Sequence, residues 1–446
     1  MKSKARWRAA LAAVVPCALL LAGCYKSAFN VGKVIGLVQR DSVAYTLLLI
    51  GDAGLPAPGP QGEPVLNALR DAIRKDDPNQ TFVVYLGDNL YPRGLPDSTE
   101  TAERALGEQI LENQINAVLS AGGRGVLVPG NHDWDAGSPE GWRFIRRQDR
   151  HVDEKGNGRV VMLPNNGCPG PEVLDLNPTL RLIVLDTEWW LQPSGSRPEG
   201  PSSECPTKTE QEIVAAVRGA LASAGGRRTV VVGHHPLVSG GEHGGYFDWP
   251  TYLQIHPYVR NGGIFARQDV TGREYTRMRI WLAGAFQQNP PLIYAAGHEH
   301  NLQVFRRAPA RYQVVSGAGV YGHTTSVRAI TGTRYARRAS GFHRVDFLKD
   351  GRVRLGVIVV DRNGTAREDF SIFLDTEGLP PVQLSTEAEL PPAGTDTASL
   401  NPAGPVRPVT PRPAPTPTPA PPSTSSPGTN QPRPATPPAA PPARTP

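Results

Sequence analysis

Nine side chains that can bind a metal ion or move a proton follow apolar runs in this sequence. They are Asp52, Asp88, Tyr91, Asn131, His132, His234, His243, His298 and His300. Taken singly, each is weak evidence, because a Gly-Asp or Asn-His pair after a strand is often only a turn. Taken together, buried carboxylates and imidazoles are costly unless a cation compensates them. This mixture of oxygen and nitrogen donors suits iron, manganese or zinc, and it is too large for one tetrahedral ion. Two ions that share one carboxylate fit the number.

The densest of these stretches follows the β-branched run Val230–Val232. The run stops at Gly233, two histidines follow, and Pro236 prevents the strand from continuing. A Gly/Ser loop then presents His243. This pattern indicates a buried strand whose carboxyl end opens into a site, where imidazoles serve as metal ligands or proton donors.

The elements that position these groups alternate between strands and helices. We expect site-bearing strands at 43–50, 81–86, 125–128, 230–232 and 292–295, a further strand at 181–185, and helices at 63–74, 99–120 and 207–224. This order predicts right-handed crossovers and a mostly parallel buried sheet, with functional residues beyond the carboxyl ends of its strands. Alternating segments at 343–348, 353–360 and 369–374 predict a closing antiparallel portion. Residues 134–178 are expected to be rich in loops, and 246–285 to form an insertion or lid.

The two ends of the chain are expected to lie outside the folded part. Residues 1–23 have a basic start and a short apolar run, which predicts a secretory signal peptide. Small residues before Cys24 resemble a bacterial lipobox, so Cys24 is expected to carry a lipid that anchors an exported protein to the cell envelope. An ordinary cleaved signal is the alternative. Residues 24–42 read as a linker, and 377–446 as a disordered tail rich in Pro, Ala and Thr.

The remaining cysteines, Cys168 and Cys205, lie in Gly/Pro-rich sequence and form a natural disulfide pair in an oxidising compartment, with two free thiols as the alternative. The formal net charge of +6 comes partly from the two ends. Because no dense basic patch alternates with aromatic residues, we expect no nucleic-acid partner.

The order of the motifs resembles that of the calcineurin-like metallophosphoesterases, and within them the small, tartrate-resistant type of purple acid phosphatase. The motifs are Asp52-Ala53-Gly54, Gly87-Asp88-Asn89-Leu90-Tyr91, Gly130-Asn131-His132-Asp133, Val231-Val232-Gly233-His234 and Gly297-His298-Glu299-His300. The resemblance covers residues 45–319. It implies an α/β fold, a four-layer αββα sandwich of two mixed sheets flanked by helices, with a catalytic domain at 43–376.

One difference within the motifs favours the purple enzymes. Most relatives have Asp-x-His in the first motif, where Gly54 stands here, so one metal ligand is missing. The purple enzymes supply a phenolate from the position of Tyr91, and a phenolate suits Fe(III). Ordinary packing of Tyr91 is the alternative, and it would leave the first ion short of a ligand.

The resemblance also implies the role of each residue. Fe(III) is held by Asp52, Asp88, Tyr91 and His300, and a divalent ion (Fe, Zn or Mn) by Asp88, Asn131, His234 and His298. His132 and His243 bind phosphate and protonate the leaving group. His235 departs from the family, which often has an aromatic residue there, and it is expected to point away from the ions. His151, His256, His323 and His343 lie outside the motifs and are expected to be structural.

We therefore expect a phosphatase that hydrolyses phosphomonoesters of small molecules or proteins by attack of metal-bound hydroxide. A phosphodiesterase or nucleotide hydrolase on the same site is one alternative. A surface lipoprotein that binds a phosphorylated ligand without turnover is another. Tyr246, Phe247, Trp249 and Tyr252 shape substrate access or pack the insertion.

Overall fold

The computed structural model describes residues 28–30, 34–35, 38–246 and 266–374. The predicted signal peptide, Cys24, the tail and part of the predicted lid, with His256, Phe247, Trp249 and Tyr252, lie outside the described residues. The segment predicted as a linker contributes β1 (Ala28–Asn30) and the short helix η1 (Arg40–Ser42). No helix within the described ranges has both the length and the apolar composition needed to cross a membrane.

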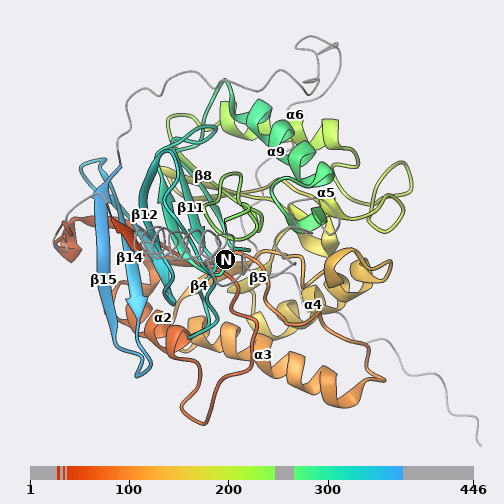
Figure 1. The fold of residues 1–446 in the computed structure, drawn as a ribbon, viewed down its shortest axis with the longest axis horizontal. Helices are drawn as coiled ribbons and strands as arrows, with labels where there is room; N and C mark the ends of the chain where they lie inside the picture. Colours follow the sequence, from red (N-terminus) through yellow and green to blue (C-terminus); the bar gives the residue numbers. More distant parts are fainter. Residues whose placement is uncertain (1–27, 31–33, 36–37, 247–265, 375–446) are drawn as a thin grey trace, which may run out of the picture. The chain divides into compact units, whose positions relative to one another are not determined.

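Two mixed sheets lie face to face, as the resemblance implied (Figure 1). The first has the order β15 (Ala366–Phe373), β14 (Val353–Val360), β13 (Gly341–Leu348), β2 (Val43–Ile50), β3 (Thr81–Tyr85), β4 (Arg124–Leu127), β5 (Val160–Met162). The second has the order β1, β12 (Thr333–Arg337), β10 (Leu302–Phe305), β11 (Tyr312–Ser316), β9 (Ile293–Ala296), β8 (Arg228–Val232), β7 (Leu180–Val184), β6 (Glu172–Asn177). In each sheet four neighbouring strands are parallel and the others antiparallel.

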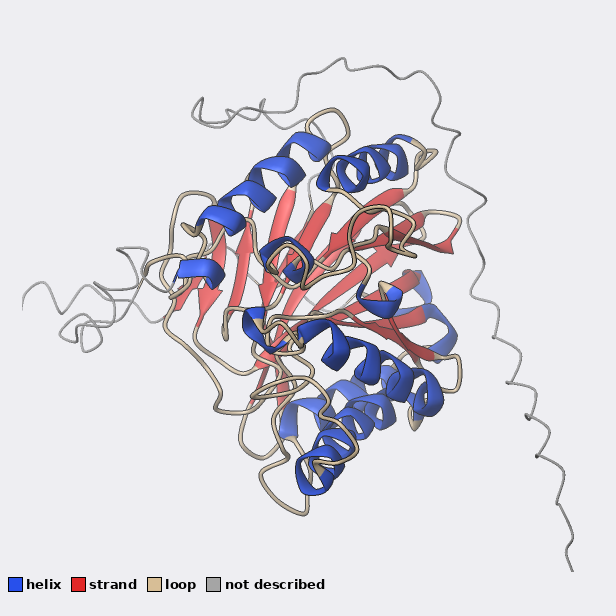
Figure 2. Cartoon of the chain, turned by 90° about the vertical axis from the view of Figure 1, so that its right-hand side faces the viewer, coloured by secondary structure: helices blue, strands red, loops and turns tan. Residues whose placement is uncertain are grey.

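Helices cover the outer face of each sheet, which completes the four layers (Figure 2). On the first sheet they are α2 (Pro64–Lys75), α3 (Thr101–Leu119) and α4 (Gly141–Gly156). On the second they are α5 (Glu188–Leu191), α6 (Glu210–Ala222) and α9 (Arg273–Phe286). Short 3-10 helices occur at η2 (Pro78–Gln80), η3 (Asp135–Gly137), η4 (Asn165–Gly167) and η5 (Ala266–Gln268).

Each central strand is apolar on both faces because both faces are covered. In β2, Leu47 and Leu49 pack into the core between the sheets, whereas Leu48 and Ile50 pack toward the helices. A strand buried on both faces reads as a continuous apolar run, and this made β2 predictable to its last residue.

The expectation that one sheet carries all the site-bearing strands was wrong. The site-bearing strands β2, β3 and β4 belong to the first sheet, whereas β8 and β9 belong to the second. Alternating strands and helices give parallel neighbours in both cases, so the alternation does not reveal where the chain passes from one sheet to the other.

Two stretches predicted as irregular contain helices. In α4, Phe144, Ile145 and Val152 are buried at helical spacing, and many of the residues between them are charged. In α9, Tyr275, Met278 and Leu282 are buried on one face at helical spacing. The lid expectation is therefore wrong for residues 273–285.

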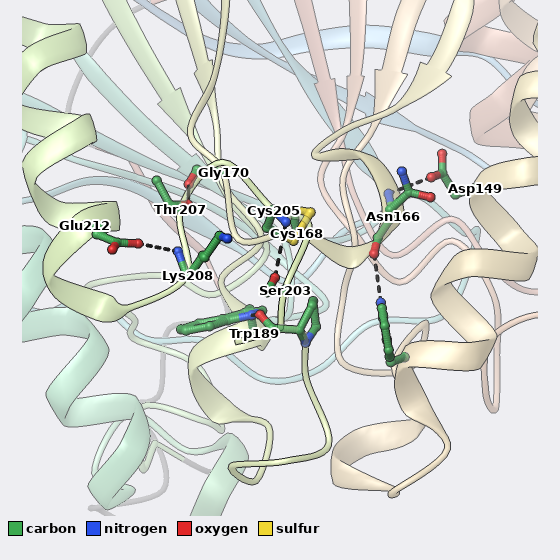
Figure 3. The surroundings of a disulfide bond; sticks show 12 residues. Asp149, Asn166, Cys168, Gly170, Trp189, Ser203, Cys205, Thr207, Lys208 and Glu212 are labelled. Atoms are coloured by element: carbon green, nitrogen blue, oxygen red, sulfur yellow. Dashed lines mark hydrogen bonds between the residues drawn. A yellow bond between two sulfur atoms is a disulfide. The ribbon is translucent and has the colours of Figure 1, made fainter. Parts of the chain in front are cut away.

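The predicted disulfide between Cys168 and Cys205 is present and joins two loops that are 37 residues apart in sequence (Figure 3). Nearby, Thr207 Oγ1 donates to the carbonyl oxygen of Gly170 at 2.6 Å, and the backbone amide of Cys205 donates to Ser203 Oγ at 3.2 Å. The bridge fixes the segment before α6 against the segment before β6.

A buried histidine in β13 makes stability depend on pH. His343 is fully buried, it pairs in register with Leu49 and Val357, and neither ring nitrogen has a hydrogen-bond partner among the described residues. Burial lowers its pKa from 6.5 to about 3. The unfolded chain therefore binds the proton more tightly than the native chain. The stabilisation that neutral His343 provides is complete above pH 6.5 and is lost as the pH falls toward 3.

The variant His343→Leu is expected to remove this dependence. Between pH 7 and pH 5, the wild type should lose about 2 kcal/mol of unfolding free energy more than the variant does. Urea unfolding at both pH values measures the difference. Equal losses in the two proteins would contradict the assignment of the dependence to His343.

Candidate metal centre

The turns after five strands bring the predicted donors together between the two sheets. Asp52 follows β2, Asp88 follows β3, Asn131 follows β4, His234 follows β8 and His298 follows β9. All five side chains are buried, with at most 5% of their surface exposed. Charged and polar groups at this depth need partners, and here the partners are one another.

The backbone at three of these positions is left-handed, which is uncommon for residues other than glycine. The φ angles are 57° at Asp52, 53° at Asp88 and 70° at His298. Non-glycine residues in this region cluster at functional sites, where the surrounding structure holds them in place. At each of the three positions the chain turns sharply at the end of its strand, where the donors of the two sheets meet.

Glycines in the motifs leave the space that this packing requires. A Cβ at Gly87 would lie 2.4 Å from Nδ1 of His234. A Cβ at Gly54 would lie 2.5 Å from the backbone of Asn89 and Leu90. Gly54 therefore leaves no room for a side chain at the position of the missing ligand. The lack of a side chain at Gly54 instead allows the 88–91 loop to approach. The backbone carbonyl of Gly54 accepts from the backbone amide of Tyr91 at 3.0 Å.

The first set of donor atoms surrounds the phenol oxygen of Tyr91. This oxygen lies 3.1 Å from Asp52 Oδ1, 3.0 Å from Asp88 Oδ2 and 3.1 Å from His300 Nε2. His300 Nε2 also lies 3.3 Å from Asp52 Oδ1. Burial and the charges of both aspartates raise the pKa of Tyr91 well above its usual value. A phenolate at this position therefore requires a strong positive charge beside it.

The second set converges on the amide oxygen of Asn131. Asn131 Oδ1 lies 2.9 Å from His234 Nε2 and 3.0 Å from His298 Nδ1, and these two nitrogens are 3.2 Å apart. On the far side of each ring the other nitrogen faces a carbonyl oxygen, that of Leu86 for His234 and that of Gln268 for His298. Since a carbonyl only accepts, it holds the ring with its other nitrogen facing the cluster.

Asp88 belongs to both sets. Its Oδ2 atom lies 3.0 Å from the phenol oxygen of Tyr91 and 3.4 Å from His234 Nε2. Its other oxygen accepts from the backbone amide of His132 at 2.9 Å. Burial opposes ionisation of Asp88, but His234 and His132 outweigh it and lower its pKa. One carboxylate oxygen therefore stands between the two sets, as a bridging ligand would.

These donor sets fit two metal ions. Donors that lie about 2.1 Å from one ion and at right angles to each other are about 3 Å apart, which is the spacing seen in both sets. The electrostatics agree, since the negative charge of Asp88 outweighs burial and raises the pKa of His234 to about 10. The cluster therefore attracts positive charge to its centre.

His235 does not take part, although one of its ring nitrogens lies within 4.8 Å of a ring nitrogen of His234 and of His298. Its Nδ1 is 2.8 Å from Thr187 Oγ1 and its Nε2 is 2.9 Å from Gln268 Oε1. Both nitrogens are thus engaged outside the cluster.

Two predicted proton donors flank the centre. The rings of His132 and Tyr91 are tilted by 49° with centroids 4.4 Å apart, and His132 Nδ1 lies 2.7 Å from the carbonyl oxygen of Pro92. The rings of His243 and His298 are tilted by 33° with centroids 3.9 Å apart, and His243 Nδ1 lies 2.9 Å from Asp269 Oδ1. Each ring is thus oriented through one nitrogen.

A third imidazole beside the centre was not singled out from the sequence. The ring of His323 lies 4.0 Å from that of His300 and 5.4 Å from that of Tyr91. The available signal was its position, four residues after the Ser316–Gly319 segment that follows β11. The other histidines regarded as structural lie elsewhere, His151 in α4 beside Glu108 and His343 in β13.

The sequence profile described as calcineurin-like phosphoesterase matches residues 45–302, more than half of the chain, and the chain therefore belongs to this family of metal-dependent phosphoesterases. No curated protein matches it.

Two solved structures show similarity at low identity. One is GAP50, the anchor in the inner membrane complex of Plasmodium, at 16% identity and a TM-score of 0.47, covering 75% of this chain and 89% of that one. The other is the purple acid phosphatase PPD1 from yellow lupin (Lupinus luteus) seeds, at 15% identity and a TM-score of 0.46, covering 77% of this chain and 57% of that one.

Metal ions are expected to stabilise the protein through Asp88. After treatment with a chelator, adding Zn²⁺ at about 100 times its dissociation constant should raise the unfolding free energy by about 2.7 kcal/mol for one ion. In Asp88→Asn most of this gain should disappear, because the shared carboxylate is lost. The chelated variant should also be less stable than the chelated wild type, because His234 loses its buried anionic partner. Thermal unfolding with and without the ion measures both effects.

Asp186→Asn is the matched control. Asp186 is also fully buried, but it accepts from Trp134 and Trp189 rather than from the cluster. This variant should keep the full gain from metal. An undiminished gain in Asp88→Asn would show that Asp88 does not bridge the two sets.

Proposed function

We propose that this protein is a dinuclear metal-dependent phosphatase that hydrolyses phosphomonoesters. The observation that carries the proposal is the position of Asp88 Oδ2 within reach of both Tyr91 and His234. Asp52, Asp88, Tyr91 and His300 would hold Fe(III), and Asp88, Asn131, His234 and His298 would hold divalent Fe, Zn or Mn. When bound, such a pair supplies a water of lowered pKa and positive charge opposite the phosphoryl oxygens.

The residues around the centre would bind the phosphate and deliver a proton. His132 and His243 are half-buried, and their rings lie next to Tyr91 and His298, so both are placed to contact a substrate at the centre. During hydrolysis, water adds to phosphorus, the ester P–O bond breaks and the alkoxide takes a proton from His243. General-acid catalysis of this kind contributes roughly 10²–10⁴-fold. Asp269 holds the His243 ring in place through Nδ1.

Substrate comparison tests the proposal. Protein lacking residues 1–23 and 377–446, loaded with metal, should hydrolyse p-nitrophenyl phosphate, and His243→Ala should lower kcat by about 10²-fold or more. Faster turnover of bis-p-nitrophenyl phosphate would instead favour a phosphodiesterase. Tight phosphate binding without turnover of either ester would favour a phosphate-binding surface protein.

The ligand role of Tyr91 predicts a colour. A phenolate bound to Fe(III) absorbs visible light, so the iron-loaded protein should be violet and Tyr91→Phe should be colourless. An absorption spectrum of both proteins, with metal analysis of each, decides the matter. A colourless wild type that carries zinc or manganese and has full activity would refute the ferric assignment.

We further propose that the protein is exported and anchored to the cell envelope by a lipid on Cys24. The support is the sequence of residues 1–24 alone. Mass spectrometry of the N-terminal peptide tests it: a diacylglyceryl group on Cys24 is expected, and an unmodified Cys24 would end the proposal.

A further inference from the structure

A buried polar pair lies directly behind the proposed metal ligands. His235 follows the proposed ligand His234, and Glu188 lies in α5. Neither side chain has any exposed surface, and His235 Nε2 lies 3.3 Å from Glu188 Oε2. Thr187 Oγ1 lies 2.8 Å from His235 Nδ1 and accepts from the backbone amides of both histidines at 3.1 Å. Since the hydroxyl has a single proton and its oxygen already accepts twice, that proton goes to His235 Nδ1. His235 Nε2 therefore carries a proton to donate.

Gln268, at the end of η5, bridges His235 and Glu188. Its Oε1 atom lies 2.9 Å from His235 Nε2, and its Nε2 atom donates to both carboxylate oxygens of Glu188 at 3.1 and 3.0 Å. The hydrogen bonds run in one direction. The Thr187 hydroxyl donates to His235 Nδ1, His235 Nε2 donates to the Gln268 carbonyl, and the Gln268 amide donates to the Glu188 carboxylate. A fully satisfied buried network of this kind rigidifies the segments that it joins.

The segment that carries Gln268 also contacts two histidines of the centre. The backbone carbonyl of Gln268 accepts from His298 Nε2 at 2.8 Å. The next residue, Asp269, holds His243 Nδ1 at 2.9 Å, and the amide of Val270 donates to the carbonyl of His243 at 2.9 Å. Displacement of these residues would therefore move a proposed metal ligand and the proposed proton donor together.

We propose that Gln268 is a positioning residue that ties His298 and His243 to the buried His235–Glu188 pair. This inference rests on the proposed function, and it accounts for a histidine at position 235. The His235 imidazole donates to the Gln268 side chain, whereas a phenylalanine at this position would offer no hydrogen bond.

Two glutamines that donate to the same carboxylate provide the test. Gln268→Met removes the amide with little change of length. Gln192→Met is the matched control, because buried Gln192 donates to Glu188 Oε1 at 2.7 Å, while its residue lies at the end of α5 and not in the 268–270 segment. Affinity for Zn²⁺ at the divalent site is measured by competition with a chelator, and kcat and KM with p-nitrophenyl phosphate.

Gln268→Met should bind Zn²⁺ about 10–100-fold more weakly, as is typical when a group that orients a metal ligand is lost. It should also lose kcat with little change in KM, whereas Gln192→Met should match the wild type in both measurements. If Gln268→Met does not fold, His235→Phe cuts the same network from the other side and should weaken Zn²⁺ binding in the same direction.

Equal Zn²⁺ affinity in the wild type and the variant that folds, with two ions bound to each, would overturn the role of Gln268 and leave the proposed function intact. An equal loss in Gln192→Met would overturn it too, because the effect would then belong to Glu188 alone. A wild type that binds no metal and hydrolyses neither ester would overturn the proposed function and this inference with it.

Discussion

The site depends on one constraint: carboxylates and imidazoles are buried together where the strand ends of the two sheets meet. Asp52 and Asp88 have almost no exposed surface, and the phenol of Tyr91 lies about equally close to a carboxylate oxygen of each. Such a group of donors is unfavourable by itself and becomes favourable when cations enter it. The same shared oxygen of Asp88 that makes the cluster costly makes it suitable for a pair of ions.

The backbone is arranged to meet this constraint. Left-handed turns at Asp52, Asp88 and His298 end their strands abruptly, and glycine at 54 and 87 removes the side chains that would keep the turns apart. The far nitrogens of His234 and His298 are fixed by backbone carbonyl groups rather than by mobile side chains. Main-chain groups therefore orient these two proposed ligands, and the two stacked sheets supply the rigidity that holds the site.

Much of the fold could be predicted from the sequence because its central strands are buried on both faces. The strand β2 and the turn carrying Asp52 follow directly from an apolar run that ends in Gly-Asp. The helix α4 was missed because only three of its buried side chains, those of Phe144, Ile145 and Val152, are large and apolar. The passage between sheets left no local signal, since parallel crossovers look alike in either sheet. His323 and Gln268 were missed for a related reason, because loops bring them to the centre and no strand end marks them.

The proposed pair of ions sharing Asp88 can be observed directly in crystals grown with iron and zinc. Anomalous diffraction at the two absorption edges should show two peaks about 3.5–4 Å apart on either side of Asp88, with iron beside Tyr91 and zinc beside Asn131. A single peak, or two peaks that Asp88 does not separate, would contradict the dinuclear centre on which the proposed function rests.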